Sequence, residues 1–208
     1  MLDDAELDLL EAKCRTVPLT TSTYVASDYV ATLLETVMDY QNTTRTVQRA
    51  GQHFERHRWD EIRTLEDLEA VMEGFPDDRE GNTALAQYLW RYNHWRRAKE
   101  LRGLAAYFRG LQVTTLQRVR EWARTSTSSD FVGKVKGLGP TVYQWLVMRL
   151  GVETVKPDVH VLRFVRDAIG RPVNEAEAVA ALEQVARRLG VRANLLDWSI
   201  WEHERSGG

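Results

Sequence analysis

The sequence predicts an all-α protein built of two helical lobes. Apolar residues recur every three or four positions along most of the 208-residue chain, and this spacing places them on one face of a helix. No convincing alternation of apolar and polar residues, the pattern of a half-buried strand, runs longer than four positions. All five prolines fall at plausible helix boundaries. The length suits one domain, or two lobes that share one chain.

In the first half of the chain, helices are expected where a capping residue precedes the helical pattern. Ser, Thr and Asn side chains accept hydrogen bonds from the free N–H groups of a first turn, and Thr64 with Asp67 can form a reciprocal capping box. The expected helices are 3–14, one capped by Ser27 and ending near Tyr40, one from Thr44 or Thr46 through Phe54, 64–72, a short one capped by Asn82, and 94–109, with Arg96, Arg97, Lys99 and Arg102 opposite its apolar face.

In the second half, glycine, proline and a polar loop separate the expected helices. Residues 140–150 are apolar nearly all round, as is typical of a buried helix, and Gly151 can end that helix. The expected helices are 115–124, a short one from Asp130 that enters the glycine loop, 140–150, one opened by Pro157-Asp158 and ending near Ile169, one from Asn174 to Leu189 stopped by Gly190, and 193–203, in which Trp198 and Trp201 should be core residues.

Composition narrows the class of protein. With 43% apolar and 28% charged residues, this is an ordinary globular chain. The single cysteine, Cys14, excludes an internal disulfide, a cysteine-rich zinc site and a four-cysteine iron–sulfur cluster, and it fits a reducing, cytoplasmic setting. The acidic start MLDDAELDLLEAK does not resemble a signal peptide. No apolar run approaches the roughly 20 residues that cross a bilayer.

The net charge of −2 hides an asymmetry. From Arg91 to Arg166 the chain has 15 Lys and Arg against 5 Asp and Glu, a net of +10. The remainder has 13 against 25, a net of −12, and the two parts sum to −2. A basic segment in an acidic chain indicates a surface for a polyanion. The alternative is that these side chains simply cover solvated helix faces.

The residues Gly137-Leu138-Gly139-Pro140 are a candidate anion site. Both glycines can adopt positive φ and present their N–H groups without hindrance, and Pro140 suits the first turn of a helix. Free N–H groups at a helix N-terminus attract phosphate. Taken alone, the same residues are typical of a tight turn between two helices that binds nothing.

Further residues make this loop part of a larger pattern. Two short helices around Gly137-Leu138-Gly139 resemble a helix-hairpin-helix element, which holds DNA phosphates through backbone N–H groups without reading sequence. The run Asp158-Val159-His160-Val161-Leu162-Arg163 is similar to the Asp-x-His-Val-x-Arg signature of the helix-hairpin-helix DNA glycosylase superfamily, which includes endonuclease III-like, adenine-specific and alkyladenine enzymes. Gln41-Asn42-Thr43 resembles the Gln-rich turn of that family, and Tyr92-Asn93 with Lys99 resembles its Tyr-Asn-x-Lys-Ala helix at a longer spacing. The resemblance covers roughly residues 27–203.

The resemblance implies an architecture and a set of site residues. One lobe would be a bundle of residues 27–133, and the other would combine 1–26 with 134–208 and carry a hairpin at about 130–150, beside the cleft. Asp158 would be the catalytic residue. The hairpin would contact DNA through Lys134, Lys136, Gly137, Leu138, Gly139 and Thr141, and the carbonyls of Lys136 and Leu138 would hold a monovalent cation. Gln41 or Asn42 would fill the gap left by a flipped base, and His160 would orient the Asp158 loop. The base pocket would be lined by Asp39, Tyr40, Tyr143 or Trp145, unless these are packing residues.

The role of Asp158 also follows from chemistry. Cleaving an N-glycosidic bond develops positive charge on the sugar, much as in glycoside hydrolysis. A carboxylate beside C1′ stabilises that charge and can orient or deprotonate the attacking water. At a helix N-terminus the positive end of the dipole stabilises a negative charge, so Asp158 suits an electrostatic stabiliser more than a general acid. The alternative is that Asp158 serves only as a helix cap.

Two departures from the family narrow the subclass. In bifunctional members, a lysine two residues after the second hairpin glycine attacks the sugar, whereas this chain has Thr141 there, which cannot do amine chemistry. The expected enzyme therefore excises a base without an efficient strand-nicking step. It has no iron–sulfur cluster, and no extra N-terminal sheet domain fits. No organic cofactor is expected. No zinc is expected either, because the five His are scattered and His53 and His57, four residues apart, lack a third ligand nearby.

The sequence therefore predicts a monomeric, monofunctional DNA glycosylase that acts on double-stranded DNA. One alternative is a non-catalytic helix-hairpin-helix protein that binds DNA, and another is a bifunctional glycosylase whose lyase lysine lies elsewhere. Alkylated, oxidised, mispaired, deaminated and hypermodified bases all remain open as substrates, because pocket shape decides among them.

Overall fold

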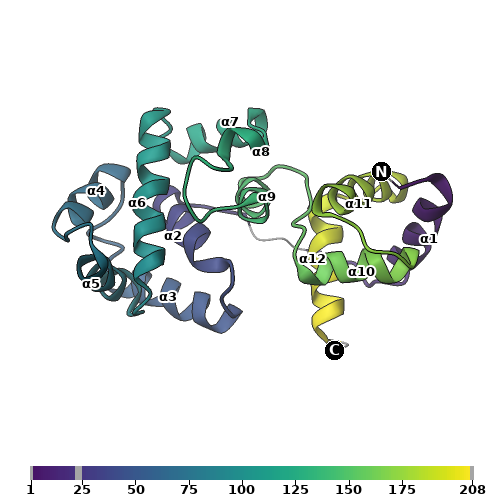
Figure 1. Cartoon of the computed structure of the whole chain (residues 1–208), viewed down its shortest axis with the longest axis horizontal. Helices are drawn as coiled ribbons and strands as arrows, with labels where there is room; N and C mark the ends of the chain where they lie inside the picture. The colour runs from purple at the N-terminus through teal and green to yellow at the C-terminus, as the bar shows by residue number, and fades with distance from the viewer. Residues whose placement is uncertain (1, 22–24, 207–208) are drawn as a thin grey trace. The chain divides into compact units, whose positions relative to one another are not determined.

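A computed structural model of the chain describes residues 2–21 and 25–206, and these residues form twelve α-helices and no strand (Figure 1). The prediction of an all-α protein is confirmed. The helices group into two compact units, which we call unit 1 (Met1–Val25 and Val147–Gly208) and unit 2 (Ala26–Leu146). None of the described helices combines the length and the hydropathy that a membrane span requires.

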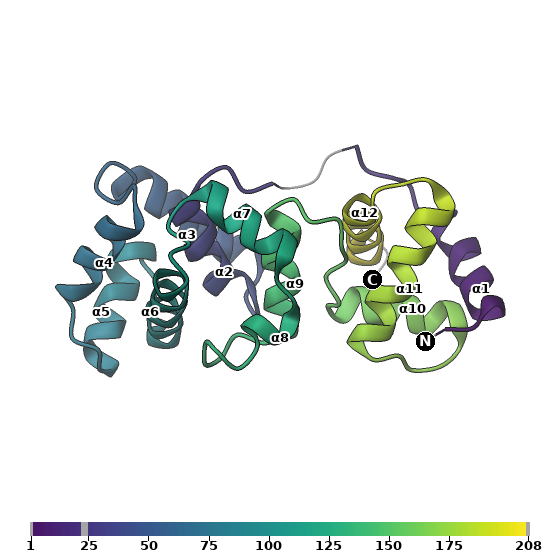
Figure 2. The same cartoon turned by 90° about the horizontal axis from the view of Figure 1, so that it is seen from above.

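Unit 2 is a bundle arranged around its longest helix, α6. Helices α2, α4 and α5 pack on α6, and α3 packs on α2 and α5; Figures 1 and 2 both show α5 beside α6. The helices of this unit are α2 (Tyr29–Asp39), α3 (Thr44–His57), α4 (Leu65–Glu73), α5 (Arg79–Trp90), α6 (Trp95–Gly110), α7 (Leu116–Thr125), α8 (Ser128–Phe131) and the first part of α9 (Pro140–Arg149).

Two predicted caps of unit 2 are wrong by one and four residues. Helix α2 is capped by Asp28, whose side chain accepts the N–H of Ala31 at 2.8 Å, and not by Ser27. Helix α5 is capped by Asp78, while Asn82 lies inside the helix. Carboxylates are as good at capping as the residues predicted, so the neighbouring aspartates take the position. The capping box of Thr64 with Asp67 is confirmed.

A cluster of aromatic rings packs α7, α8 and α9, the last helices of unit 2, together with α6. The rings of Phe108 and Trp122 lie 4.9 Å apart edge-on, and those of Phe131 and Tyr143 lie 5.8 Å apart. Edge-on aromatic pairs add to the stability that burial gives. Because these rings come from α6, α7, α8 and α9, residues 134–146 belong to unit 2, and the boundary lies between Leu146 and Val147 rather than at the predicted 133–134.

Unit 1 combines the N-terminal helix with the C-terminal part of the chain. Helix α1 (Asp4–Cys14) packs on α10 (Val159–Ile169) and α11 (Glu175–Leu189), and α12 (Ala193–Ser206) packs on the same two helices. Gly170 and Gly190, with φ of +78° and +69°, end α10 and α11 by the left-handed conformation that glycine adopts most readily. The core of this unit is apolar and includes Leu7, Leu10, Phe164, Leu182 and Ile200.

Candidate nucleic-acid interface

The hairpin loop, residues 132–139 between α8 and α9, is anchored by apolar side chains and exposes its charges. Val135 and Leu138 are buried, whereas Lys134, Lys136 and Gly137 are exposed. Gly137 has φ +96°, in the region that favours glycine. The first helix of this hairpin is only the four residues of α8, so the aromatic cluster and the buried loop side chains hold the loop in place.

The hairpin loop contains backbone N–H groups that could bind an anion. Among the described residues, neither Gly137 nor Gly139 donates its N–H to a backbone carbonyl. The carbonyl of Gly139 accepts the N–H groups of Val142 and Tyr143, each at 3.1 Å, and so begins α9. Free amides before a helix N-terminus form an anion site. Thr141 is half-exposed in the first turn of α9 and contributes a hydroxyl rather than an amine.

The Gln41 turn, residues 40–43 between α2 and α3, sets its two polar side chains apart. Gln41 is exposed at φ +56°, an uncommon conformation for a residue with a Cβ. Asn42 donates its side-chain N–H to the carbonyl of Met38 at 2.7 Å and accepts the hydroxyl of Tyr92 at 3.2 Å. Asn42 therefore holds the turn, and Gln41 is the one of the two whose side chain is exposed.

A buried ion pair on α6 joins the Gln41 turn to the hairpin loop. Arg97 is 3% exposed; its Nη2 donates to the carbonyl of Tyr40 at 2.5 Å, and its guanidinium carbon lies 3.6 Å from the centre of the Tyr40 ring. Its Nη1 lies 3.3 Å from Oε2 of Glu100. The other oxygen of Glu100 lies 2.6 Å from where a Cβ on Gly137 would stand. Two segments distant in sequence therefore meet on one turn of α6.

Electrostatics of this junction favour a fixed geometry. Burial, followed by the hydrogen bond with Glu100, raises the pKa of Tyr40, so its hydroxyl remains protonated and able to donate. Arg97 was predicted to lie on the solvated face of its helix, and that prediction is wrong because Tyr40, 57 residues away in sequence, covers it. The i, i+3 spacing of Arg97 and Glu100 was the one signal of this pair in the sequence.

Much of the positive charge near α6 is neutralised. Arg102 lies 3.8 Å from Asp77, and Arg109 pairs with Glu66 at 2.8 Å and with Glu69 at 2.5 Å. In the hairpin loop and from Arg91 to Lys99, the basic side chains that remain exposed are Arg91, Arg96, Lys99, Lys134 and Lys136. These five, rather than the whole basic segment, are the candidates for contacts with a phosphate backbone.

The segment that resembles the Tyr-Asn helix supports the Gln41 turn. The ring of Tyr92 stacks on that of His94 with centroids 5.7 Å apart, and its hydroxyl reaches Asn42. Asn93 is hydrogen-bonded to Gln87 of α5. Although the spacing from Asn93 to Lys99 is longer than in the family, this segment still contacts the Gln41 turn.

In unit 1, Asp158 caps α10 with one oxygen. Its Oδ1 accepts the N–H of His160 at 2.9 Å and that of Val161 at 3.1 Å, while its own N–H donates to the carbonyl of Lys156 at 2.8 Å. Among the described residues, Oδ2 has no hydrogen bond. The side chain is half-buried, and the neighbouring Val159 is 73% exposed. The geometry fits the predicted cap and leaves one oxygen for a substrate.

A second carboxyl group is hydrogen-bonded to the turn that carries Asp158. Asp197, on α12, is 4% exposed and accepts the N–H of Lys156 at 2.9 Å. Burial is the main cause that raises the pKa of Asp197 to about 8; the hydrogen bond from the Lys156 N–H opposes this rise, and the charge of Asp158 adds to it. Sequence reasoning missed this residue because an aspartate in an amphipathic C-terminal helix gives no local sign of burial.

His160 has structural contacts. Its ring meets that of Trp201 edge-on with centroids 6.5 Å apart, and its Nδ1 lies 3.4 Å from Nη2 of Arg163. Trp201 in turn stacks on Trp198 at 5.0 Å. Both tryptophans are half-buried and so are not the core residues that were predicted. The contacts of His160 suit the predicted role of orienting the start of α10.

The four base-pocket candidates differ in their surroundings. Tyr143 is 6% exposed, donates its hydroxyl to the carbonyl of Ser126 at 2.7 Å and lies within the aromatic cluster, as a packing residue would. Tyr40 is half-buried and covered by Arg97. Asp39 and Trp145 are both half-exposed. No single one of these is distinguished by its contacts as a partner for a base.

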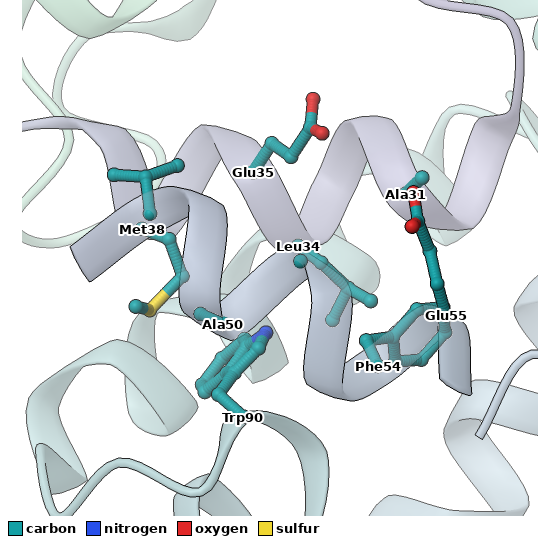
Figure 3. A pocket seen from close by; sticks show the side chains of 10 residues that line it. Ala31, Leu34, Glu35, Met38, Ala50, Phe54, Glu55 and Trp90 are labelled. Carbon is teal, nitrogen blue, oxygen red and sulfur yellow. The ribbon is translucent and has the colours of Figure 1, made fainter. Parts of the chain in front are cut away.

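A groove between α2 and α3 lies close to the Gln41 turn in sequence. It has an empty volume of about 330 Å³, part of it open solvent, and an apolar floor that includes Leu34, Met38 and Trp90 (Figure 3). Glu35 points away from Leu34 and Trp90 in that view. The floor offers few polar groups for base-specific hydrogen bonds, so we do not assign this groove as a base pocket.

The predicted cation would rely on backbone oxygens. The carbonyls of Lys136 and Leu138 accept no backbone N–H among the described residues, so they fit a hard monovalent cation that prefers oxygen ligands. The described residues contain no group of three or more His, Cys, Asp or Glu that could hold a metal. His53 and His57 lie with ring centroids 4.7 Å apart, as neighbours on α3.

Replacing Gly137 by Ala is expected to cost more stability than replacing Gly133. Both glycines have positive φ, +96° and +83°, but only at Gly137 would a Cβ meet another atom, Oε1 of Glu100. The backbone strain costs about 1–2 kcal/mol at either site, and Gly137→Ala must in addition move a side chain held by Arg97. Urea midpoints of the two variants measure the difference, and equal losses would show that Glu100 does not support the loop.

The comparisons with known proteins give a family and no activity. A family model described as "Domain of unknown function (DUF8548)" matches residues 28–205. The match begins at the cap of α2 and ends one residue before the end of α12, so it includes the Gln41 turn, the hairpin loop and the Asp158 turn. No curated protein matches the chain.

Proposed function

We propose, for a chain that belongs to this family of unknown function (DUF8548), the activity of a monofunctional DNA glycosylase. Unit 2 would hold the DNA backbone through the hairpin amides and the exposed lysines, and Gln41 would fill the space of the flipped base. Unit 1 would supply Asp158 for the departure of the base. The protein would leave an abasic site in an uncut strand.

The observation that carries this proposal is the Arg97–Glu100 junction. The Gln41 turn and the hairpin loop were each predicted, from separate residues, to contact DNA. Arg97 donates to the first of these segments, and its ion-pair partner Glu100 lies beside Gly137 of the second. A protein that uses both segments on one duplex needs a fixed spacing between them, because a shift of 1 Å in positioning can cost roughly 100-fold in rate. A pair of unrelated turns has no need of such a connection.

The chemistry assigned to Asp158 follows from its cap geometry. The N–H groups of His160 and Val161 and the helix dipole stabilise a negative charge on the carboxyl group. As the bond from C1′ to the base breaks, its electron pair leaves with the base and positive charge grows on the sugar. A carboxylate with one oxygen engaged and one available can face that charge and accept a proton from the attacking water.

A panel of single-lesion duplexes tests the proposal. Each duplex would carry one alkylated, oxidised, deaminated, mispaired or hypermodified base, and hot alkali would reveal an abasic site as a strand break. We expect breaks in at least one duplex that depend on alkali. Borohydride should trap little covalent adduct, because Thr141 cannot form a Schiff base. A strong adduct would contradict the monofunctional assignment, and no breaks in any duplex would contradict the activity.

A further inference from the structure

Asp197 is a buried carboxyl that accepts a hydrogen bond from the turn that carries Asp158. Its Oδ1 accepts the backbone N–H of Lys156 at 2.9 Å, and the carbonyl of the same Lys156 accepts the N–H of Asp158 at 2.8 Å. Asp197 is 4% exposed. The peptide units of Lys156 therefore connect a side chain of α12 to the backbone of the proposed catalytic residue.

The charges that act on Asp197 come from this turn. Asp158 opposes its ionisation and Lys156 favours it. On the two helices packed against α12, three titratable or charged groups have other partners. On α10, His160 meets the ring of Trp201 and Arg163 pairs with Glu204 at 2.7 Å; on α11, Glu183 accepts the hydroxyl of Thr154 at 2.8 Å.

We propose that Asp197 is a positioning residue for Asp158, and that it acts as a neutral carboxylic acid. This inference rests on the proposed function, since it concerns the placement of the carboxylate assigned there. A buried carboxylate with one amide donor and a like charge nearby is costly to keep ionised. A neutral acid can still accept the Lys156 N–H through its carbonyl oxygen, and it adds no second negative charge near Asp158.

A protonated Asp197 predicts how activity and stability depend on pH. Burial raises the pKa of Asp197 to about 8 from an ordinary value of 3.8. Between those values the folded protein keeps a proton that the unfolded chain releases, so stability falls as pH rises from about 4 to about 8 and then levels. Above pH 8 the ionised group repels Asp158, and base release should decline.

The first arm of the test needs no activity. Urea unfolding of the full chain and of its Asp197→Asn variant would be compared between pH 5 and pH 9. We expect the ratio of their unfolding equilibrium constants to change about tenfold per pH unit up to about pH 8 and to level above it. In the Asp158→Asn background the levelling point should move to lower pH, because a like charge has been removed. A ratio independent of pH overturns the neutral acid, and an unmoved levelling point overturns the link to Asp158.

The second arm is the pH profile of single-turnover base release on the duplex found in the lesion panel. The wild type should lose rate above about pH 8, and Asp197→Asn, which keeps an acceptor but cannot ionise, should not. Asp197→Ala, which removes the acceptor, should be slower by roughly tenfold or more at every pH. Equal profiles for wild type and Asp197→Asn overturn the positioning role. If no base is released from any duplex, the proposed function fails, while the first arm still decides whether Asp197 is neutral and coupled to Asp158.

Discussion

Replacing Asp158 by Asn is expected to reduce single-turnover base release by at least about 100- to 1,000-fold, the loss typical when one electrostatic stabiliser is removed. The carboxylate that faces the growing charge on the sugar becomes a neutral amide. Affinity for the duplex should stay the same or rise, because a negative charge near the phosphates disappears. Rates and affinities on one lesion duplex measure both effects.

The fold should tolerate this change. Asparagine caps helices about as well as aspartate, so the amide oxygen can still accept the N–H groups of His160 and Val161. The chain offers a matched control in Asp28, which caps α2 by accepting the N–H of Ala31. Asp28→Asn makes the same chemical change at a helix cap in unit 2 and should leave base release unchanged within about twofold.

The same pair of variants separates the rival functions. If the wild type excises a base and Asp158→Asn excises it equally fast, Asp158 is a cap and another residue does the chemistry. If the wild type binds duplexes tightly and excises nothing from the whole panel, the chain is a DNA-binding protein that keeps the hairpin. A large loss in both Asp158→Asn and Asp28→Asn would instead report damage to the fold.

The sequence predicted the helices well because their signals are local. The capping box at Thr64 and the glycines after α10 and α11 each act within a few residues of the element they limit. The errors at Ser27 and Asn82 arose where several capping residues stand close together, since propensity alone does not choose among them. The first part of α9 was placed in the wrong lobe because aromatic contacts across α6 to α9, invisible in sequence, decide its unit.

Only part of the candidate site was predicted, again because the signals in a sequence are local. The positive φ of Gly137 and the cap of Asp158 depend on neighbours in the chain, and both stand where the residues indicated. Arg97 and Asp197 are polar residues whose burial depends on segments distant in sequence. A helical period assigns such residues to a solvated face, so tertiary contacts alone reveal them as supports for the predicted loops.

Arg97→Met is expected to lower the free energy of unfolding by about 3–5 kcal/mol, the usual loss when one partner of a buried ion pair is removed. The side chains of Arg97 and Glu100 are 4% and 12% exposed, so the Glu100 carboxylate would remain poorly solvated. The carbonyl of Tyr40 would also lose its donor, which costs about 1–3 kcal/mol when an acceptor stays buried. Urea unfolding measures the loss.

Arg58 provides an unusually close control for this change. Its guanidinium carbon lies 3.7 Å from the centre of the Tyr88 ring, its Nε donates to the carbonyl of Tyr88 at 3.1 Å, and it pairs with Glu61, three residues on, at 3.5 Å. The arrangement repeats that of Arg97 with Tyr40 and Glu100, but its side chains are 28% and 47% exposed. Arg58→Met should therefore cost only about 1 kcal/mol, as solvated ion pairs do.

The double variant Arg97→Met with Glu100→Gln distinguishes charge from packing. Removing both charges leaves no buried ion behind, so stability should recover by a large part of the loss in Arg97→Met. Affinity for a duplex should not recover with it, because the Gln41 turn has lost its hydrogen bond from Arg97 and the hairpin loop has lost its charged neighbour Glu100. If stability and affinity recover together, the ion pair serves the fold alone, and the two loops are positioned independently. If affinity stays low in a protein as stable as the wild type, the pair is what fixes the spacing of two DNA-binding segments.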